Sequence, residues 1–231
     1  MADSVKGPKK DGRAARWEEH RGRRRAEFVD AAVRAVERHG PDVRTDQIAA
    51  EAGVPRPRLY RYFDGKADLE RAIVERAGDL CAAEFAALWD PHGTPAQIIG
   101  TAADSWLRWV TDHANLYRYA RKVHAAGLHA PYSETKSAFG GRVSALLRAY
   151  AGFLGLDPRV AEPLSSGILG MAEAATHRWL EAGQEVGRDE MAGHLARWII
   201  AMLTDTAAHL GTSLDPSKPL PELATVRPAA D

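Results

Sequence analysis

The segment TDQIAAEAGVPRPRLYRYFDGK, from Thr45 to Lys66, decides the fold of this chain. It predicts two short helices joined by a turn at Gly53, because glycine accepts the left-handed backbone that redirects a chain after a helix. The second helix is rich in arginine and tyrosine, and the i, i+4 spacing of Leu59 and Phe63 predicts that both face the core. This arrangement is typical of a helix-turn-helix that places its second helix in the major groove of DNA.

The neighbouring sequence predicts the helices that surround this motif. Apolar residues recur at helical spacing over Arg23–His39, which predicts a first helix with one buried face. Thr45 is expected to cap the second helix, and the third is expected over Arg56–Phe63. A long fourth helix is expected from Lys66 to about Trp89.

The rest of the chain is also expected to be helical. No segment alternates apolar and polar residues with β-branched enrichment, so an all-α fold without a sheet is predicted. The proline-rich segment 212–231 is expected to be an extended or disordered tail. The further expected helices are Pro95–Asp112, Ala114–Ala126, Tyr132–Leu154, Pro158–Ala182 and Arg188–Leu210.

The formal net charge is zero, yet the charges are unevenly distributed. Residues 1–63 hold 15 Lys and Arg against 10 Asp and Glu, whereas residues 64–231 hold 16 against 21. The excess of positive charge surrounds the predicted helix-turn-helix, as DNA binding requires. Residues 1–20 are expected to form a basic flexible arm that either contacts phosphates or only aids solubility.

Several classes of protein are disfavoured by the sequence. It has no run of 18 apolar residues and no apolar signal-peptide core, so a cytoplasmic protein without membrane contact is expected. Cys81 is the only cysteine and is expected to be inert packing rather than a redox sensor. Glu173 and His177 have chelating spacing, but no second pair matches them. Without a phosphate loop or a GxSxG elbow, we predict no enzyme, no metal and no cofactor.

From Arg25 to Leu69 the chain resembles the N-terminal domain of the TetR family of bacterial transcriptional regulators. The resemblance is carried by IAAEAGV at Ile48–Val54 and by the following residues, which are Leu59, Tyr60, Tyr62, Phe63, Lys66, Asp68 and Leu69. Pro55 and Pro57 depart from the serine cap and the small residue that are common in the family, and Arg58 also replaces a usually small residue, which leaves the DNA sequence preference open.

Seven side chains are candidates for contacts with double-stranded DNA. Arginine can donate bidentately to guanine or hold a phosphate, and both roles are open for the three arginines, which are Arg56, Arg58 and Arg61. The resemblance implies contacts with the DNA backbone from Thr45, Tyr60, Tyr62 and Lys66. For Tyr62, packing on the next helix is the alternative.

The segment between Phe85 and Phe139 is rich in aromatic residues. An aromatic core would explain this composition, whereas the resemblance implies a cavity for a small, largely apolar effector. The candidate pocket residues are Phe85, Trp106, Trp109, Tyr117, Arg121, His124 and Phe139.

The last two long helices carry extended stripes of apolar and small residues. The resemblance implies that they form a four-helix contact in a homodimer. The candidate interface residues are Leu164, Ile168, Met171, Ala175, Trp179, Leu195, Ile199, Met202 and Leu203.

Together these expectations divide the chain into four segments. After the arm come a helix-turn-helix domain at 21–66, a helical effector-binding and dimerisation domain at 67–211, and the tail. The predicted function is a transcriptional regulator, a repressor that a small effector releases from a palindromic operator. The alternative is a helical carrier of lipids or drugs that touches DNA only incidentally. The sequence leaves open the effector, the operator, the regulated genes and whether the protein represses or activates.

Overall fold

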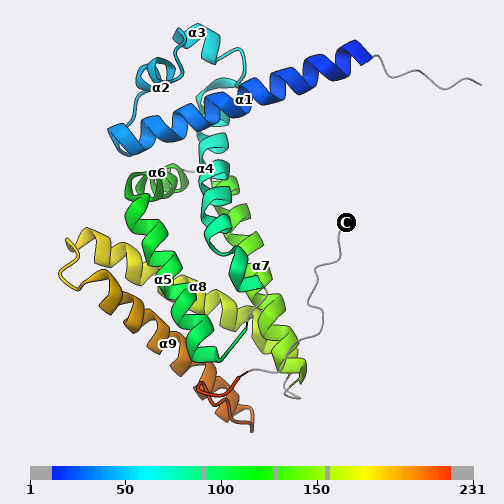
Figure 1. Ribbon diagram of the computed structural model, residues 1–231, viewed down its shortest axis with the longest axis vertical. Helices are drawn as coiled ribbons and strands as arrows, with labels where there is room; N and C mark the ends of the chain where they lie inside the picture. The colour runs from blue at the N-terminus through cyan, green and yellow to red at the C-terminus, as the bar shows by residue number, and fades with distance from the viewer. Residues whose placement is uncertain (1–11, 90–91, 127–128, 154–156, 220–231) are drawn as a thin grey trace, which may run out of the picture. The chain divides into compact units, whose positions relative to one another are not determined.

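The computed structural model describes residues 12–89, 92–126, 129–153 and 157–219, and all regular structure in these ranges is helical (Figure 1). The predicted all-α class is therefore confirmed. The α-helices are α1 (Gly12–His39), α2 (Thr45–Glu51), α3 (Arg56–Leu59), α4 (Gly65–Glu84), α5 (Pro95–Asp112), α6 (Ala114–Ala125), α7 (His129–Phe153), α8 (Ala161–Glu181) and α9 (Arg188–His209). Two short 3-10 helices are η1 (Ala86–Trp89) and η2 (Pro158–Val160).

The chain forms two compact units. The head consists of Met1–Ala77 together with Asn115–His129, and the body consists of Gly78–Ala114 together with Ala130–Asp231. Helix α6 thus belongs with the helix-turn-helix in space, although it lies far from it in the sequence. The boundary predicted at residue 66 follows the sequence order and misses this association.

The core of the head explains why the helix-turn-helix is a rigid platform. Val36 of α1, Ile48 of α2 and Ile73 of α4 are buried, and Leu59 of α3 is completely buried. Each large apolar side chain buried in this way contributes about 1.5–3 kcal/mol. Phe63 is only 4% exposed, so the prediction that Leu59 and Phe63 face the core is confirmed.

The turn between α2 and α3 has the predicted geometry. Gly53 has a φ of +65°, and the amide of Val54 donates to the carbonyl of Ala49 at 3.0 Å. This bond satisfies a carbonyl that the end of α2 leaves unpaired. A residue with a Cβ would be strained at Gly53, so the turn depends on glycine.

Three expectations for the head are corrected. Helix α1 begins at Gly12 rather than Arg23, because Ala, Arg and Glu favour helix strongly enough to outweigh repulsion between like charges. Residues 12–20 of the expected flexible arm are therefore helical, and residues 1–11 lie outside the described residues. Arg44, not Thr45, is the N-cap of α2, and its amide donates to Gln47 Oε1 at 2.8 Å. Helix α3 ends at Leu59 instead of Phe63.

The body is built around α5. This helix packs along α9, and Trp106 of α5 donates from Nε1 to Thr176 Oγ1 of α8 at 2.8 Å. The tail contacts the start of α5 at Pro216, whose carbonyl accepts from the amide of Ala96 at 3.0 Å. Among the helices described, none has the length and apolar character needed to cross a membrane.

Candidate DNA-binding surface

Helix α3 and the turn that follows it present arginines to solvent on the side opposite the core. Arg56, Arg58 and Arg61 are exposed, whereas Leu59, between them in sequence, is buried. Arg56 lies 5.5 Å from the centre of the Tyr60 ring and pairs with Asp46 at 3.5 Å. An exposed ion pair of this kind contributes about 0–1 kcal/mol, so it orients the Arg56 guanidinium but is weak enough to be exchanged for a contact with DNA.

Two of the side chains that are predicted to contact the DNA backbone lie side by side. Thr45 Oγ1 at the start of α2 and Tyr60 Oη at the end of α3 are 3.4 Å apart. Both side chains are half-buried, which restricts their motion while leaving the hydroxyls near the surface. Two hydroxyls at this spacing can donate to the oxygens of one phosphate group.

Tyr62 has a packing role that the sequence left as an alternative. Its ring meets Phe28 of α1 edge-on, with centroids 5.0 Å apart and planes at 67°. It therefore packs on α1. The ring is nevertheless half-exposed, and it contributes to two hollows on the arginine-bearing side of the head.

Lys66 lies in the first turn of α4, with its side chain 72% exposed. Its Nζ is 3.3 Å from Glu70 Oε1, one helical turn further on. Both the positive end of the helix dipole and the ammonium group favour the binding of an anion. The position fits the phosphate contact predicted for Lys66.

A network missed by sequence reasoning fixes the turn before α4. Asp68 accepts from the amide of Asp64 at 3.0 Å through Oδ2 and from Arg25 Nη2 at 2.8 Å through Oδ1. The Arg25 guanidinium also lies 4.8 Å from the centre of the Phe63 ring. Asp68 belongs to the motif that carries the family resemblance, but its partner Arg25 lies 43 residues away and has no local signal.

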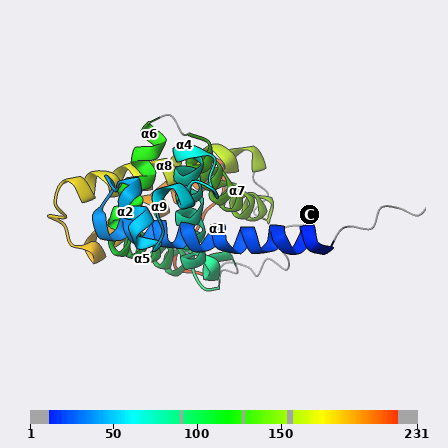
Figure 2. The ribbon, with the colours of Figure 1, turned by 90° about the horizontal axis from the view of Figure 1, so that it is seen from above.

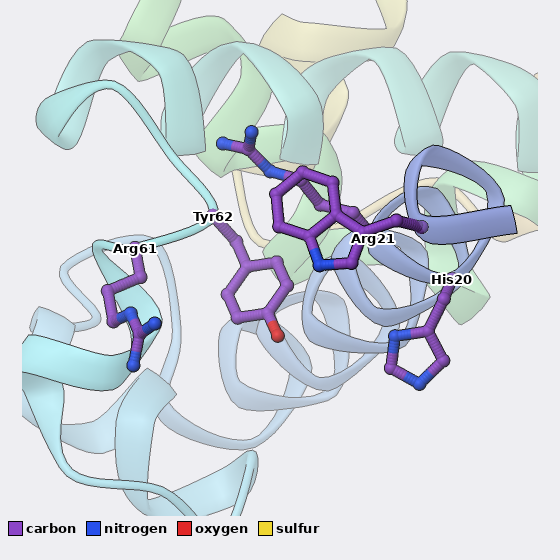
Figure 3. A pocket seen from close by; sticks show the side chains of 5 residues that line it. His20, Arg21, Arg61 and Tyr62 are labelled. Carbon is purple, nitrogen blue, oxygen red and sulfur yellow. The ribbon is translucent and has the colours of Figure 1, made fainter. Parts of the chain in front are cut away.

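Two hollows extend this surface onto the N-terminal part of α1. The first has a volume of about 210 Å³ and is lined by Trp17, His20, Arg21, Arg61 and Tyr62 (Figure 3). The second, of about 400 Å³, is lined by His20, Arg23, Arg24, Glu27, Arg58 and Tyr62. Sequence reasoning missed this part of the surface because it assigned residues 1–20 to a flexible arm.

The candidate pocket residues fall into two groups. Within the body, Phe85 and Phe139 meet edge-on at 4.9 Å, and Trp106 stacks on Trp109 at 6.1 Å between ring centroids. The other three residues, Tyr117, Arg121 and His124, lie on α6 in the head unit. The structure therefore brings together the aromatic pairs of the body but does not establish one site made of all seven residues.

The candidate interface residues also divide, by burial. Three of them, Ile168, Trp179 and Leu195, are at most 7% exposed within the single chain. Trp179 donates from Nε1 to the carbonyl of Val186 at 2.7 Å, which closes the α8–α9 connection. These three side chains are thus already buried within the subunit, and their assignment to an interface stays a prediction. The partly exposed candidates are Leu164, Met171, Ala175, Ile199, Met202 and Leu203.

Neither Cys81 nor the Glu173–His177 pair shows the chemistry of a reactive site. Burial raises the pKa of the Cys81 thiol to about 12, which keeps it protonated and unreactive near neutral pH. Throughout the described part of the chain, no group of three or more His, Cys, Asp or Glu side chains is placed to hold a metal ion.

Fold and surface together define a DNA-binding transcriptional regulator of the helix-turn-helix class. Residues 28–73 match the profile of the bacterial regulatory proteins, tetR family. The chain is 33% identical over 144 residues to the HTH-type transcriptional regulator BetI of Brucella melitensis, with 52% of this chain and 72% of that protein covered. The chain belongs to the TetR family, whose members are regulators and not enzymes.

Other similarities extend over more of the chain. It is 28% identical over 226 residues to an uncharacterized HTH-type transcriptional regulator of Mycobacterium tuberculosis, covering 96% of this chain and 94% of that one. A tetR-family regulator from Streptomyces coelicolor has a similar crystal structure, with a TM-score of 0.67, 23% identity and coverage of 81% and 83%. FadR from Bacillus subtilis, crystallised in complex with stearoyl-CoA, aligns with a TM-score of 0.62, 16% identity and coverage of 77% and 98%.

Proposed function

We propose that this regulator is a homodimeric repressor that binds a palindromic operator and leaves it when a largely apolar small molecule binds to the body. The observation that carries the proposal is the exposed row of arginines on and after α3, held over a buried core and flanked by the hydroxyls of Thr45 and Tyr60 and the ammonium of Lys66. This combination supplies both base-reading and phosphate-holding groups on one side of the head.

The division of roles follows from the chemistry of each group. Arg58 and Arg61 are exposed and present the planar fork that matches O6 and N7 of guanine. Thr45, Tyr60 and Lys66 lie at the starts of α2 and α4 and at the end of α3, where the backbone of the duplex passes a bound recognition helix. Contacts with phosphates then fix the register in which the arginines meet the bases.

The proposed dimer uses the exposed faces of α8 and α9. Trp198 of α9 is 39% exposed and stacks on His194 at 5.6 Å between ring centroids. A large aromatic side chain left at the surface of one subunit favours burial against another. Two-fold symmetry would present two α3 helices to successive major grooves, about 34 Å apart.

Helix α6 supports a route by which the effector acts on the head. Asn115 Nδ2 donates to the carbonyl of Glu37 in α1 at 2.8 Å, and Lys122 forms an ion pair with Asp42 in the loop before α2. Because α6 follows α5 after a single residue, a shift of α5 that a ligand favours is transmitted to the helix bound to α1. A typical coupling of about 1–3 kcal/mol would change operator affinity about 5- to 150-fold.

The aromatic clusters of the body support an apolar effector. Trp89 and Phe139 meet at 5.3 Å between ring centroids, next to the Phe85–Phe139 contact. Trp89 Nε1, Trp109 Nε1 and Ser144 Oγ are buried without a hydrogen-bond partner among the described residues, so a ligand could satisfy them. The Bacillus subtilis protein of similar fold that was crystallised with stearoyl-CoA is a precedent for a lipid-like ligand.

A DNA-binding assay tests the proposal. The protein is titrated against a duplex selected from the DNA around its own gene and against a scrambled duplex of the same length, with and without a panel of acyl-CoA thioesters and planar aromatic drugs. We expect selective, salt-dependent binding to the selected duplex and release by at least one ligand. Equal affinity for the two duplexes would contradict the operator, and unchanged affinity across the panel would contradict an apolar effector.

A further inference from the structure

Helix α1 continues well beyond the core that it helps to form. Phe28 is the first of its deeply buried residues, and Gly12 lies 16 residues before it, which corresponds to about 24 Å of helix. Figures 1 and 2 both show this N-terminal part running past α2. A helix extension of this length needs a use other than packing the head.

One face of the extension lies in line with the core-facing stripe of α1, but its side chains are basic and aromatic. At helical spacing before Phe28 stand Arg24, Arg21 and Trp17, and the indole of Trp17 is 64% exposed. The Arg21 guanidinium lies 5.7 Å from the centre of the Trp17 ring. Residues 16–25 hold five arginines against two glutamates, so the extension is positively charged as well as aromatic.

This face meets the DNA-reading part of the head in the two hollows. Arg21 and Arg61 line the first hollow from two different elements, α1 and the turn after α3, as Figure 3 shows. The second hollow joins Arg24 to Arg58 of α3, and His20 and Tyr62 line both hollows. The basic surface of α1 is thus continuous with the surface that carries the recognition arginines.

We propose that the segment Arg16–Glu27, here called the α1 extension, is a second DNA-binding element that holds the backbone flanking the base pairs read by α3. In this arrangement Arg21 and Arg61 bind phosphates of one strand, and Trp17 packs against the adjoining sugars. The inference rests on the proposed function, because it needs α3 in the major groove. An arginine fork suits a phosphate, and an open hollow suits a DNA backbone that passes along the surface.

The dimensions and the charge favour a duplex as the occupant. Successive phosphates of one strand rise by about 3.4 Å along the duplex axis, and the 12 residues of the α1 extension form about 18 Å of helix, so the extension can reach more than one phosphate. Arg58 and Arg61 belong to both the recognition surface and the hollows, so one duplex can contact both surfaces. The α1 extension would then lengthen the footprint on each half-site without reading its sequence.

Two duplexes that share one operator test this inference. The short duplex ends at the operator, and the long one adds ten base pairs of scrambled sequence on each side. We expect the wild-type protein to bind the long duplex about tenfold more tightly, with a steeper dependence on salt. Arg21→Ala and Trp17→Ala should lose most of this preference while binding the short duplex within about twofold of the wild type.

Matched variants separate the contact from a general charge effect. Arg38→Ala removes the same charge from the other end of α1, where the side chain is 64% exposed, and should behave as the wild type on both duplexes. Arg21→Lys keeps the charge without the fork and should retain an intermediate preference for the long duplex.

Three results would overturn the inference. They are equal affinity of the wild type for the two duplexes, an equal loss on both duplexes for Arg21→Ala, and a changed molecular mass for Trp17→Ala, which would assign the indole to a protein contact. A wild-type protein that binds no duplex selectively would instead refute the proposed function itself.

Discussion

Arg25 in α1 donates to Asp68 in α4 at 2.8 Å, and this pair joins the first helix of the head to the turn that follows the DNA-reading helix. Asp68 also accepts from the amide of Asp64, so one carboxylate secures both the start of α4 and its attachment to α1. The pair is about one-third exposed, with side-chain exposures of 36% and 26%, so its Coulombic contribution is partly screened.

Asp68→Ala should therefore destabilise the head by about 1–2 kcal/mol, because it removes a helix-capping acceptor and leaves Arg25 unpaired. Arg25→Ala should cost less, about 1 kcal/mol, because the cap remains. Urea unfolding monitored by circular dichroism measures both changes. Arg38→Ala, which leaves Arg34 paired with Glu51, is the control and should change the free energy of unfolding by less than either. Equal values for all three variants would contradict a structural role for Asp68.

Lys66→Ala should weaken binding to selected and random duplexes alike, because a phosphate contact carries no sequence information. The slope of log affinity against log salt should become shallower by about one for each subunit. Filter binding at four salt concentrations measures the slope. A loss confined to the selected duplex would assign Lys66 to base reading instead.

Asn115→Ala should uncouple ligand binding from DNA binding, because it removes the hydrogen bond from α6 to the Glu37 carbonyl. We expect operator affinity without ligand to stay within about threefold, since a neutral hydrogen bond is worth about 0.5–1.5 kcal/mol, while release by the effector weakens. Titration of a protein–DNA complex with effector measures the coupling. Unchanged release would show that the signal takes another route.

Trp198→Glu should convert the dimer to monomers, because it places a charge where the exposed indole is proposed to be buried by the partner. The neighbouring exposed residue provides the control, Arg197→Glu, which should leave the mass unchanged. Sedimentation equilibrium distinguishes the two masses. A dimer that persists in Trp198→Glu would place the interface elsewhere.

Cys81 should react slowly with a thiol reagent in the native protein. The thiolate is the reactive form, and a pKa raised to about 12 by burial leaves the half-buried thiol protonated at pH 8, so the native thiol reacts slowly. Absorbance with Ellman's reagent should show a slow native reaction and a rapid one in urea. Reaction of the native protein at the rate of the unfolded chain would contradict the burial.

Local sequence signals predicted the parts of the fold that depend on local physics. The period of apolar residues placed α5 at Pro95–Asp112 without error, and the glycine at position 53 located the turn. Leu59 and Phe63 were placed in the core by their spacing alone. These features need no knowledge of distant partners.

The features that the sequence did not reveal are of two kinds. Some depend on contacts between residues far apart in the chain, and others depend on which of two opposing local effects is stronger. Helix α1 starts at Gly12 because helix propensity outweighs the repulsion between like charges, whereas the composition of this segment predicted a flexible arm. The packing of Tyr62 on Phe28, the Arg25–Asp68 pair and the association of α6 with the head are all long-range contacts. Leu195 appeared in a stripe like that of an interface, but packing within the body buries it.

The specificity ratio, the dissociation constant for a scrambled duplex divided by that for the selected operator at physiological salt, tests the central claim most directly. For the wild type we predict a ratio of at least about 10³, as expected of a specific regulator. Arg58→Ala should lower the ratio about tenfold or more, because a base contact is worth about 1–3 kcal/mol. A wild-type ratio near one, or an Arg58→Ala ratio equal to that of the wild type, would contradict a DNA-reading role for this helix.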